Sequence, residues 1–416
     1  MIAKTPPMGW NSWDCYGAAV TETIVRQNAE YMAKHLKPYG WEYVVVDIEW
    51  YQPTASTHDY QAFSDLVMDD FGRLQPAVNR FPSAAGGAGF KPLADYIHGL
   101  GLKFGIHIMR GLPRMAAHRH LPIFGTDYRC DEAANPNSIC AWNPDMYGLF
   151  ADRPAAKAYY DSIFRLYAEW GVDFVKCDDI AREYPHCKRE IEIISEACRG
   201  CGRDIVLSLS PGPSPIEQAE HLKANANMWR ITDDFWDNWP LLKGMFERAE
   251  KWCIHAGPGH WPDADMLPVG AIRLCYDDHP LGKWTNLTEA EQRTMLTLWC
   301  MLRSPLMIGG ELTLNDDFTF KLLTNGEVLE IERESWCAHP LYTTEEECVW
   351  IAPRKDGRGC YVAAFNLSDE PRTMNINTPE THVFSHAKEL WRGIKTDTLE
   401  VSLPSHDAAV WLLEFT

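Results

Sequence analysis

Residues Gly171–Asp179 read GVDFVKCDD and combine a short apolar run with a lysine and two aspartates. A run of this length after a helix-ending glycine is typical of a strand that is buried on both faces. Carboxylates at the carboxyl end of such a strand lie at the rim of the sheet, where open α/β sheets and barrels carry their chemistry. Asp178 or Asp179 could instead cap the next helix. The stretch therefore predicts a parallel α/β fold with a candidate site at this strand end.

A second stretch of the same design follows farther along the chain. Asn227–Asp234, NMWRITDD, runs from a short strand into two carboxylates, and Arg230 precedes Asp234 by four residues. Two carboxylates on separate strand ends form the constellation that glycoside hydrolysis needs, because one attacks or activates water while the other donates and then takes a proton. A nearby cation such as Lys176 or Arg230 keeps one carboxylate ionised. The two stretches together indicate a hydrolase of glycosidic bonds.

Composition limits the class of protein. The chain has 416 residues and is 46% hydrophobic, which suits a barrel with a smaller second domain. Its 58 acidic and 39 basic residues give a net charge of −19, which argues against nucleic acid or an anionic membrane as a partner. No segment approaches the ~20 apolar residues of a membrane span, and Met1–Trp10 lacks the apolar core of a signal peptide. We therefore expect a cytoplasmic protein whose 13 cysteines are reduced thiols.

Strands and helices alternate regularly up to about residue 330. The predicted strands are Met8–Trp10, Trp41–Val46, Lys103–Ile108, Val172–Val175, Asp204–Leu209, the start of Asn227–Asp234, Trp261–Leu267 and Pro305–Ile308. The predicted helices are Glu22–Leu36, Pro92–Leu100, Ala155–Trp170, Arg189–Cys198, Pro215–Leu222, Pro240–Cys253 and Glu289–Arg303. This pattern predicts an α/β fold of the (β/α)8 TIM-barrel type over residues 1–333. A doubly wound sheet is the alternative, but no Gly-x-Gly-x-x-Gly loop follows the first strand.

The predicted secondary structure changes near Ser335. Short β-rich runs separated by turn signals replace the helical pattern, as at Val349–Ala352, Gly359–Phe365, Met374–Ile376, Glu389–Trp391 and Ala408–Phe415. Such runs predict a C-terminal antiparallel β-sandwich domain over residues 334–416.

Several motifs, spread in order along the chain, resemble those of glycoside hydrolase family twenty-seven, which contains α-galactosidases and α-N-acetylgalactosaminidases. They are MGWNSWD (Met8–Asp14), YVVVDIEW (Tyr43–Trp50), GRLQPAVNRFP (Gly72–Pro82), KFGIH (Lys103–His107), VKCD (Val175–Asp178), WRITDD (Trp229–Asp234), GPGHWPDADML (Gly257–Leu267) and RSPLMIGG (Arg303–Gly310). The resemblance covers nearly the whole chain, the C-terminal sandwich included. It implies a retaining mechanism through a covalent glycosyl-enzyme, with no metal and no cofactor.

The resemblance also implies roles for individual residues. Asp178 matches the family's nucleophile in its Lys-x-Asp motif, and Asp234 matches the acid/base. The residues that match sugar-binding positions of the family are Trp13, Asp47, Lys176, Arg230 and Asp265.

Three departures from the family pattern bear on the choice of sugar. The second of a pair of sugar-binding aspartates is Ile48 here, followed by Glu49, so a charged acceptor for a sugar hydroxyl is missing. The family's aromatic sugar contact after the third strand is His107. Ser210 stands where galactosidases tend to carry a larger acidic residue and N-acetylgalactosaminidases a serine. The cysteines of the family's disulfides are also missing at the matching sites.

The segment Met109–Leu149 is longer than the corresponding loop of the family. Because loops after barrel strands carry substrate selectivity, it is expected to shape the pocket or to supply contacts to a neighbouring subunit. A purely structural excursion packed on the barrel is the alternative.

We therefore expect a retaining exo-glycosidase that acts on terminal α-D-galactoside-type sugars of small glycosides or oligosaccharides, in a protein that could form homo-oligomers. The rivals of the same chemistry are α-N-acetylgalactosaminidase, β-L-arabinopyranosidase and an isomaltose-releasing glucanase. Arabinopyranose has the ring stereochemistry of galactose without its hydroxymethyl group, so the apolar Ile48 favours it among these. A non-catalytic sugar-binding relative is the rival of another class, and the presence of both Asp178 and Asp234 argues against it.

Overall fold

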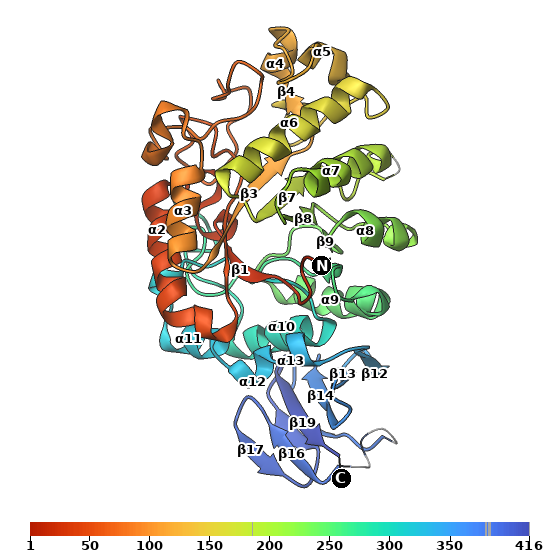
Figure 1. Ribbon diagram of the computed structural model, residues 1–416. Coiled ribbons are helices and arrows are strands. Elements are labelled where there is room, and N and C mark those ends of the chain that lie inside the picture. The colour runs from red at the N-terminus through yellow and green to blue at the C-terminus, as the bar shows by residue number, and fades with distance from the viewer. Residues whose placement is uncertain (185, 379–380, 382–383, 416) are drawn as a thin grey trace.

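The computed structural model describes residues 1–415 except 185, 379–380 and 382–383. Within that part of the chain, eight parallel strands follow one another in chain order around a barrel (Figure 1). They are β1 (Met8–Asn11), β2 (Tyr43–Val46), β3 (Lys103–Met109), β7 (Phe174–Asp178), β8 (Val206–Leu209), β9 (Met228–Arg230), β10 (Trp261–Asp263) and β11 (Leu306–Ile308). The barrel closes because β11 pairs with β1 and because Leu267, just beyond β10, bridges to Ile308. The predicted TIM barrel is confirmed.

Helices cover the outside of the barrel (Figure 1). The main ones are α2 (Glu22–Tyr31), α3 (Lys91–Gly99), α6 (Pro154–Trp170), α7 (Lys188–Gly200), α8 (Ala219–Asn225), α9 (Trp239–Trp252) and α10 (Glu289–Leu302). The shorter ones are α1 (Trp13–Tyr16), α11 (Asp317–Leu323), α12 (Gly326–Leu329) and α13 (Ile331–Glu334). The prediction for Pro215–Leu222 was displaced: Pro215 is extended, a 3₁₀ turn follows at Ile216–Gln218, and α8 begins only at Ala219.

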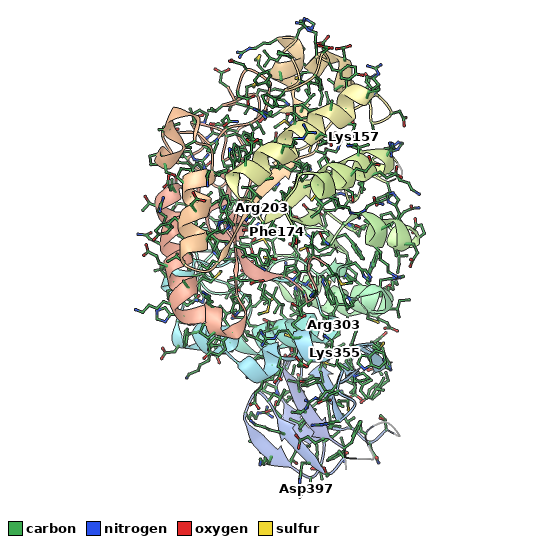
Figure 2. The ribbon with its side chains drawn as sticks, in the orientation of Figure 1. Lys157, Phe174, Arg203, Arg303, Lys355 and Asp397 are labelled. Carbon is green, nitrogen blue, oxygen red and sulfur yellow. The ribbon has the colours of Figure 1, made fainter. Side chains whose placement is uncertain are left out.

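Two apolar layers line each barrel strand, because successive side chains point to opposite faces. On β7, Val175 and Cys177 pack outward into the main core beneath the helices. Phe174, labelled in Figure 2, points inward and joins a smaller cluster with residues of the other strands. That cluster fills the barrel interior with Tyr43, Val45, Val206, Met228, Trp261, Met266 and Met307. The same alternation sends Lys176 and Asp178 inward at the carboxyl end of β7, above this apolar floor.

The segment after β3 is a small structured subdomain. Strands β4 (Leu112–Pro113), β5 (Ala134–Ile139) and β6 (Met146–Leu149) form an antiparallel sheet in the order β4-β6-β5. Two short helices, α4 (Arg114–His118) and α5 (Cys130–Ala133), accompany it. Figure 1 shows this subdomain and the blue C-terminal domain at opposite ends of the molecule.

The C-terminal domain is the predicted antiparallel sandwich. A six-stranded sheet in the order β12-β13-β14-β19-β16-β17 faces the two-stranded sheet β15-β18, counted over the described residues. These strands are β12 (His339–Thr343), β13 (Glu347–Pro353), β14 (Gly359–Asn366), β15 (Arg372–Asn375), β16 (His386–Glu389), β17 (Ile394–Thr396), β18 (Glu400–Leu403) and β19 (Ala408–Glu414). Arg293 of α10 donates to both oxygens of Asp407 at 2.9 Å, which joins the barrel to the sandwich. Over the described residues no helix is both long and apolar enough to cross a membrane.

Candidate active site

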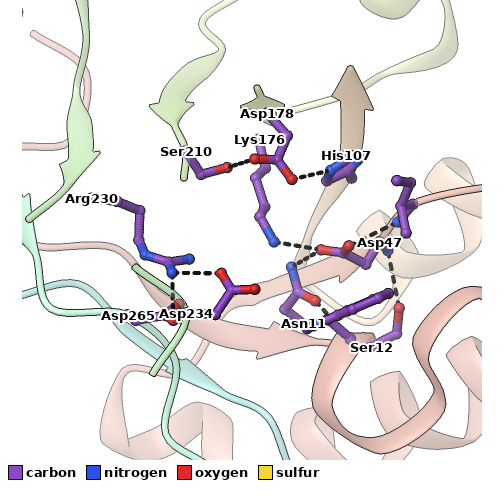
Figure 3. A network of polar contacts seen from close by, with 12 residues as sticks. Asn11, Ser12, Asp47, His107, Lys176, Asp178, Ser210, Arg230, Asp234 and Asp265 are labelled. Atoms are coloured by element: carbon purple, nitrogen blue, oxygen red, sulfur yellow. Dashed lines mark hydrogen bonds and ion pairs between the residues drawn. The ribbon is translucent and has the colours of Figure 1, made fainter. Parts of the chain in front are cut away.

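Polar side chains from several strand ends meet at one mouth of the barrel (Figure 3). Lys176 and Asp178 come from β7, His107 from β3 and Arg230 from β9, while Asp47 directly follows β2. Because all barrel strands run in parallel, their carboxyl ends lie at the same rim. The structure thus brings together residues that lie far apart in the sequence.

Asp178 is held by three donors. His107 Nε2 lies 3.0 Å from one carboxylate oxygen, and the Ser210 hydroxyl and the Asp179 amide donate to the other at 2.9 and 3.0 Å. Burial alone would raise the pKa of this carboxyl, but the hydrogen bond and charge of His107 and the charge of Lys176 hold the pKa well below its usual range. Asp178 is therefore an ionised, oriented carboxylate with only 13% of its side chain exposed.

Asp47 and Lys176 form a buried ion pair beside it. Lys176 Nζ donates to Asp47 Oδ2 at 2.9 Å, and the Asn11 amide donates to the same oxygen at 2.8 Å. Burial would lower the pKa of Lys176, but the carboxylates of Asp47 and Asp178 raise it above its usual range. Both side chains line the pocket, so a ligand meets a fixed ammonium and a fixed carboxylate there.

Arg230 connects the two remaining carboxylates. Its Nη2 lies 2.9 Å from Asp234 Oδ1 and 2.7 Å from Asp265 Oδ2. Burial raises the pKa of Asp265 to about 7; Arg230 opposes that rise, while Asp234 and Asp263 add to it. Asp234 differs from Asp178 in its surroundings, because 51% of its side chain is exposed. Asp178 ends β7 and Asp234 lies in the loop after β9, and both line the same pocket (Figure 3).

The pocket between these carboxylates is narrow. The space between its side chains, counted together with the open mouth, is about 380 Å³. Trp13 forms one wall and stacks on Tyr60, with ring centroids 5.1 Å apart and planes 13° from parallel. The backbone of Trp13 is held locally because its amide donates to Asn11 Oδ1 at 2.8 Å.

The sequence analysis missed several residues that line this pocket: Asp14, Tyr60, Phe235, Trp236 and Met266. Asp14 could have been found, since it directly follows Trp13 in the first motif. It is buried, and its Oδ2 has no hydrogen-bond partner among the described residues. Burial raises the pKa of Asp14, and the charges of Asp265, Asp234 and Asp47 add to this rise while the charge of Lys176 opposes it. Tyr60 carries no sequence signal of this kind.

Three residues expected to bind substrate do not line the described pocket. His107 is fully buried and contacts Asp178, which lines the pocket, without lining the pocket itself. Ser210 also acts on Asp178, and it lines a second space deeper in the barrel. Ile48 is buried beside Asp47, and its amide donates to Asp47 Oδ1 at 2.9 Å.

Glu49 faces away from the pocket as well. It is buried with a backbone φ of 63°, and its carboxylate accepts from the Gln61 amide at 3.1 Å and from the Asn143 side chain at 3.3 Å. Asn143 belongs to the subdomain after β3. Glu49 therefore ties the loop after β2 to that subdomain and does not replace the missing sugar-binding aspartate.

The surroundings of Glu49 predict a pH-dependent effect on stability. Burial raises its pKa to about 7 in the folded protein, against ~4.3 in the unfolded chain. The folded protein thus holds the proton more tightly, and this stabilisation is lost as the pH rises from ~4 through 7. Glu49→Gln keeps an acceptor but cannot ionise. Its free energy of unfolding relative to wild type should therefore increase by about 1–3 kcal/mol from pH 5 to pH 8. Urea unfolding at both pH values measures this, and a difference that does not change with pH would contradict it.

No group of three or more His, Cys, Asp or Glu side chains able to hold a metal ion occurs in the part of the chain that the structure describes. The arrangement itself offers acid–base and nucleophilic chemistry: a buried ionised carboxylate and a more exposed carboxyl face the same pocket.

Known proteins share both domains. The sequence profile of the family described as alpha galactosidase A matches residues 5–119 and 145–334, and the alpha galactosidase C-terminal beta sandwich domain matches residues 345–413. The first match omits residues 120–144, which lie in the subdomain after β3. An alpha-galactosidase of Cyamopsis tetragonoloba is 25% identical over 423 residues, which cover 99% of this chain and 87% of the relative.

Two solved structures have a higher sequence identity to this chain than the Cyamopsis alpha-galactosidase has. A family-27 β-L-arabinopyranosidase from Geobacillus stearothermophilus is 53% identical, with a TM-score of 0.95 over 99% of this chain and 97% of that one. A variant of the same protein in complex with arabinose is 52% identical, with a TM-score of 0.96 over 100% of this chain and 98% of that one.

The barrel, the C-terminal sandwich and these matches define a glycoside hydrolase of the galactosidase type. The chain belongs to glycoside hydrolase family twenty-seven, the family indicated by its motifs.

Proposed function

We propose that this enzyme is a retaining exo-glycosidase that removes a terminal β-L-arabinopyranosyl group in preference to its α-D-galactosyl counterpart. Asp178 attacks the anomeric carbon while Asp234 gives its proton to the departing oxygen, and a glycosyl ester forms on Asp178. Water then attacks the same carbon, Asp234 takes a proton from it, and the ester bond to Asp178 breaks. The observation that carries the proposal is the pairing of a buried, ionised Asp178 with an exposed Asp234 across one narrow pocket.

The likeness to the Geobacillus β-L-arabinopyranosidase supports the choice of sugar. The residue after Asp47 adds chemical support: Ile48 lies outside the pocket lining, and as an apolar side chain it supplies no carboxylate beside Asp47 that could accept a hydrogen bond from a sugar hydroxyl. Asp47, Lys176, Arg230 and Asp265 would hold the ring hydroxyls, since all four are polar groups that line the pocket.

A panel of nitrophenyl glycosides tests this proposal. The panel should include β-L-arabinopyranoside, α-D-galactoside, α-N-acetylgalactosaminide and α-D-glucoside. We expect the highest kcat/KM on the arabinopyranoside, and nuclear magnetic resonance of the first-formed product should show retained configuration. A higher kcat/KM on the galactoside or the N-acetylgalactosaminide would overturn the choice of sugar. Binding without hydrolysis of any of them would overturn the enzymatic function.

Substitutions of Ile48 test the basis of the preference. Ile48→Asp supplies a carboxylate beside Asp47, whereas Ile48→Ala only removes apolar volume behind the pocket. Both variants should raise the kcat/KM ratio of α-galactoside to β-L-arabinopyranoside, Ala by about tenfold or more because differences of methylene size are worth ~1–3 kcal/mol. An unchanged ratio in both folded variants would mean that Ile48 does not contact the sugar.

The proposed enzyme is cytoplasmic. All thirteen cysteines are free in the structure, and most are buried, as in proteins of reducing compartments. Fractionation of the producing cells, with this enzyme detected by antibody, tests the location.

A further inference from the structure

We infer that a second cavity, next to the catalytic pocket, binds a ring of the leaving group. This inference rests on the proposed function and adds to it a site for the part of the substrate beyond the cleaved bond. The cavity lies over the start of α9 and the loop before α10. Its lining includes Trp236, Asn238, Tyr276, His279 and Leu281, and its volume is about 520 Å³. That volume is within the ~300–1,000 Å³ range of ligand-binding pockets.

The two cavities share a wall. Trp236 lines both of them. His58 is fully buried behind this wall, with its ring 6.2 Å from Trp236 and 4.8 Å from Trp13. Tyr276, on the far side, stacks on His58 with ring centroids 4.0 Å apart. A continuous row of rings therefore leads from the sugar-facing Trp13 to the second cavity.

The position of Asp234 directs the leaving group toward this cavity. An acid/base must contact the oxygen of the bond that is cleaved, so the leaving group lies on its far side from the bound sugar. Asp178 is enclosed, whereas Asp234 is half exposed, which places the open side of the pocket at Asp234. Trp236 lines the catalytic pocket together with Asp234 and also lines the second cavity, so a leaving group that extends past Asp234 toward that cavity meets its indole.

The floor of the cavity is preformed. Arg273 donates to both oxygens of the buried Asp237 at 2.7 and 2.9 Å and to the carbonyls of Gly282 and Trp284 at 2.8 Å. Because Asp237 neutralises the charge of Arg273, the cavity offers a ligand rings and small polar groups rather than a free cation. Trp236 and Tyr276 suit a ring with an apolar face, such as a sugar or an aromatic ring, and Asn238 and His279 suit hydroxyl groups.

Three glycosides of the sugar preferred in the panel test the inference: the methyl glycoside, the benzyl glycoside and the disaccharide linked to O6 of glucose. Their leaving alcohols are all primary or methanol and differ little in acidity, so kcat/KM reports mainly the binding of the added ring. We expect kcat/KM for the benzyl glycoside and for the disaccharide to exceed that of the methyl glycoside by about tenfold or more. If kcat/KM is raised for only the benzyl glycoside or only the disaccharide, the cavity binds an aromatic ring or a sugar ring, respectively.

Leu281→Asp tests the location of the effect. Leu281 lines only the second cavity and is 54% exposed, so a charge there is tolerated by the fold. The variant should lower kcat/KM for the benzyl glycoside more than for the methyl glycoside, reducing their ratio by about threefold or more. The matched control is Leu314→Asp at a leucine that is 52% exposed and outside both cavities, and it should leave the ratio at its wild-type value.

Hydrolysis of all three glycosides with equal kcat/KM would overturn the second site and leave the proposed function standing. A benzyl-to-methyl ratio that Leu281→Asp leaves unchanged would do the same. Absence of hydrolysis on every glycoside would overturn both.

Discussion

Asp178→Ala should lower kcat by at least about three orders of magnitude, because the covalent intermediate can no longer form. Azide should restore part of the activity, since it fits the space left by the carboxylate and attacks the anomeric carbon from that side. One displacement then replaces two, so the glycosyl azide should have inverted configuration. Its configuration is measured by nuclear magnetic resonance.

Asp179→Asn is the matched control for this experiment. Asp179 adjoins Asp178 in the sequence, but its carboxylate pairs with Arg110 at 3.0 Å and does not line the pocket. The control should change kcat by less than about tenfold and show no rescue by azide. Azide rescue of an Asp179 variant, together with an active Asp178→Ala, would show that the nucleophile has been assigned to the wrong aspartate.

Asp234→Ala should have the second largest effect, and its size should depend on the leaving group. For an alkyl leaving group, which needs a proton, we expect kcat/KM to fall by about 10²–10⁴. For a dinitrophenyl leaving group, which departs as the anion, the loss should stay below about tenfold. Azide should again accelerate the variant, but through the second of two displacements, so the glycosyl azide should retain its configuration.

Asp233→Asn provides the control, because Asp233 adjoins Asp234, is exposed and pairs with Arg182 at 2.7 Å, and an asparagine keeps the side-chain oxygen that accepts from the Asp234 amide at 2.9 Å. It should behave as wild type on both kinds of substrate. Equal losses for alkyl and dinitrophenyl glycosides in Asp234→Ala would contradict the acid role. An inverted azide product from that variant would mean that the roles of Asp178 and Asp234 are exchanged.

The sequence by itself determined which side chains face the barrel interior. Alternation along a strand is local, so Lys176 and Asp178, two residues apart on β7, necessarily share the face of Phe174. The order of eight buried strands, with a carboxylate at several of their carboxyl ends, likewise made the barrel and the candidate site predictable. The change from helical to β-rich runs near Ser335 predicted the C-terminal sandwich, because the hydrophobic periods of strands and helices differ and can be read from the local sequence.

Tertiary structure alone decided how the loops complete the site. Glu49 turns away from the sugar because its backbone has a positive φ and its carboxylate finds Asn143, which lies 94 residues further along the chain. His107 and Ser210 act on Asp178 because neighbouring strands place them there. The wall of Trp236, His58 and Tyr276 joins loops far apart in the sequence, and the cavity beside it exists only once they meet. No local period encodes contacts of this kind, because they depend on where each loop travels after its strand has ended.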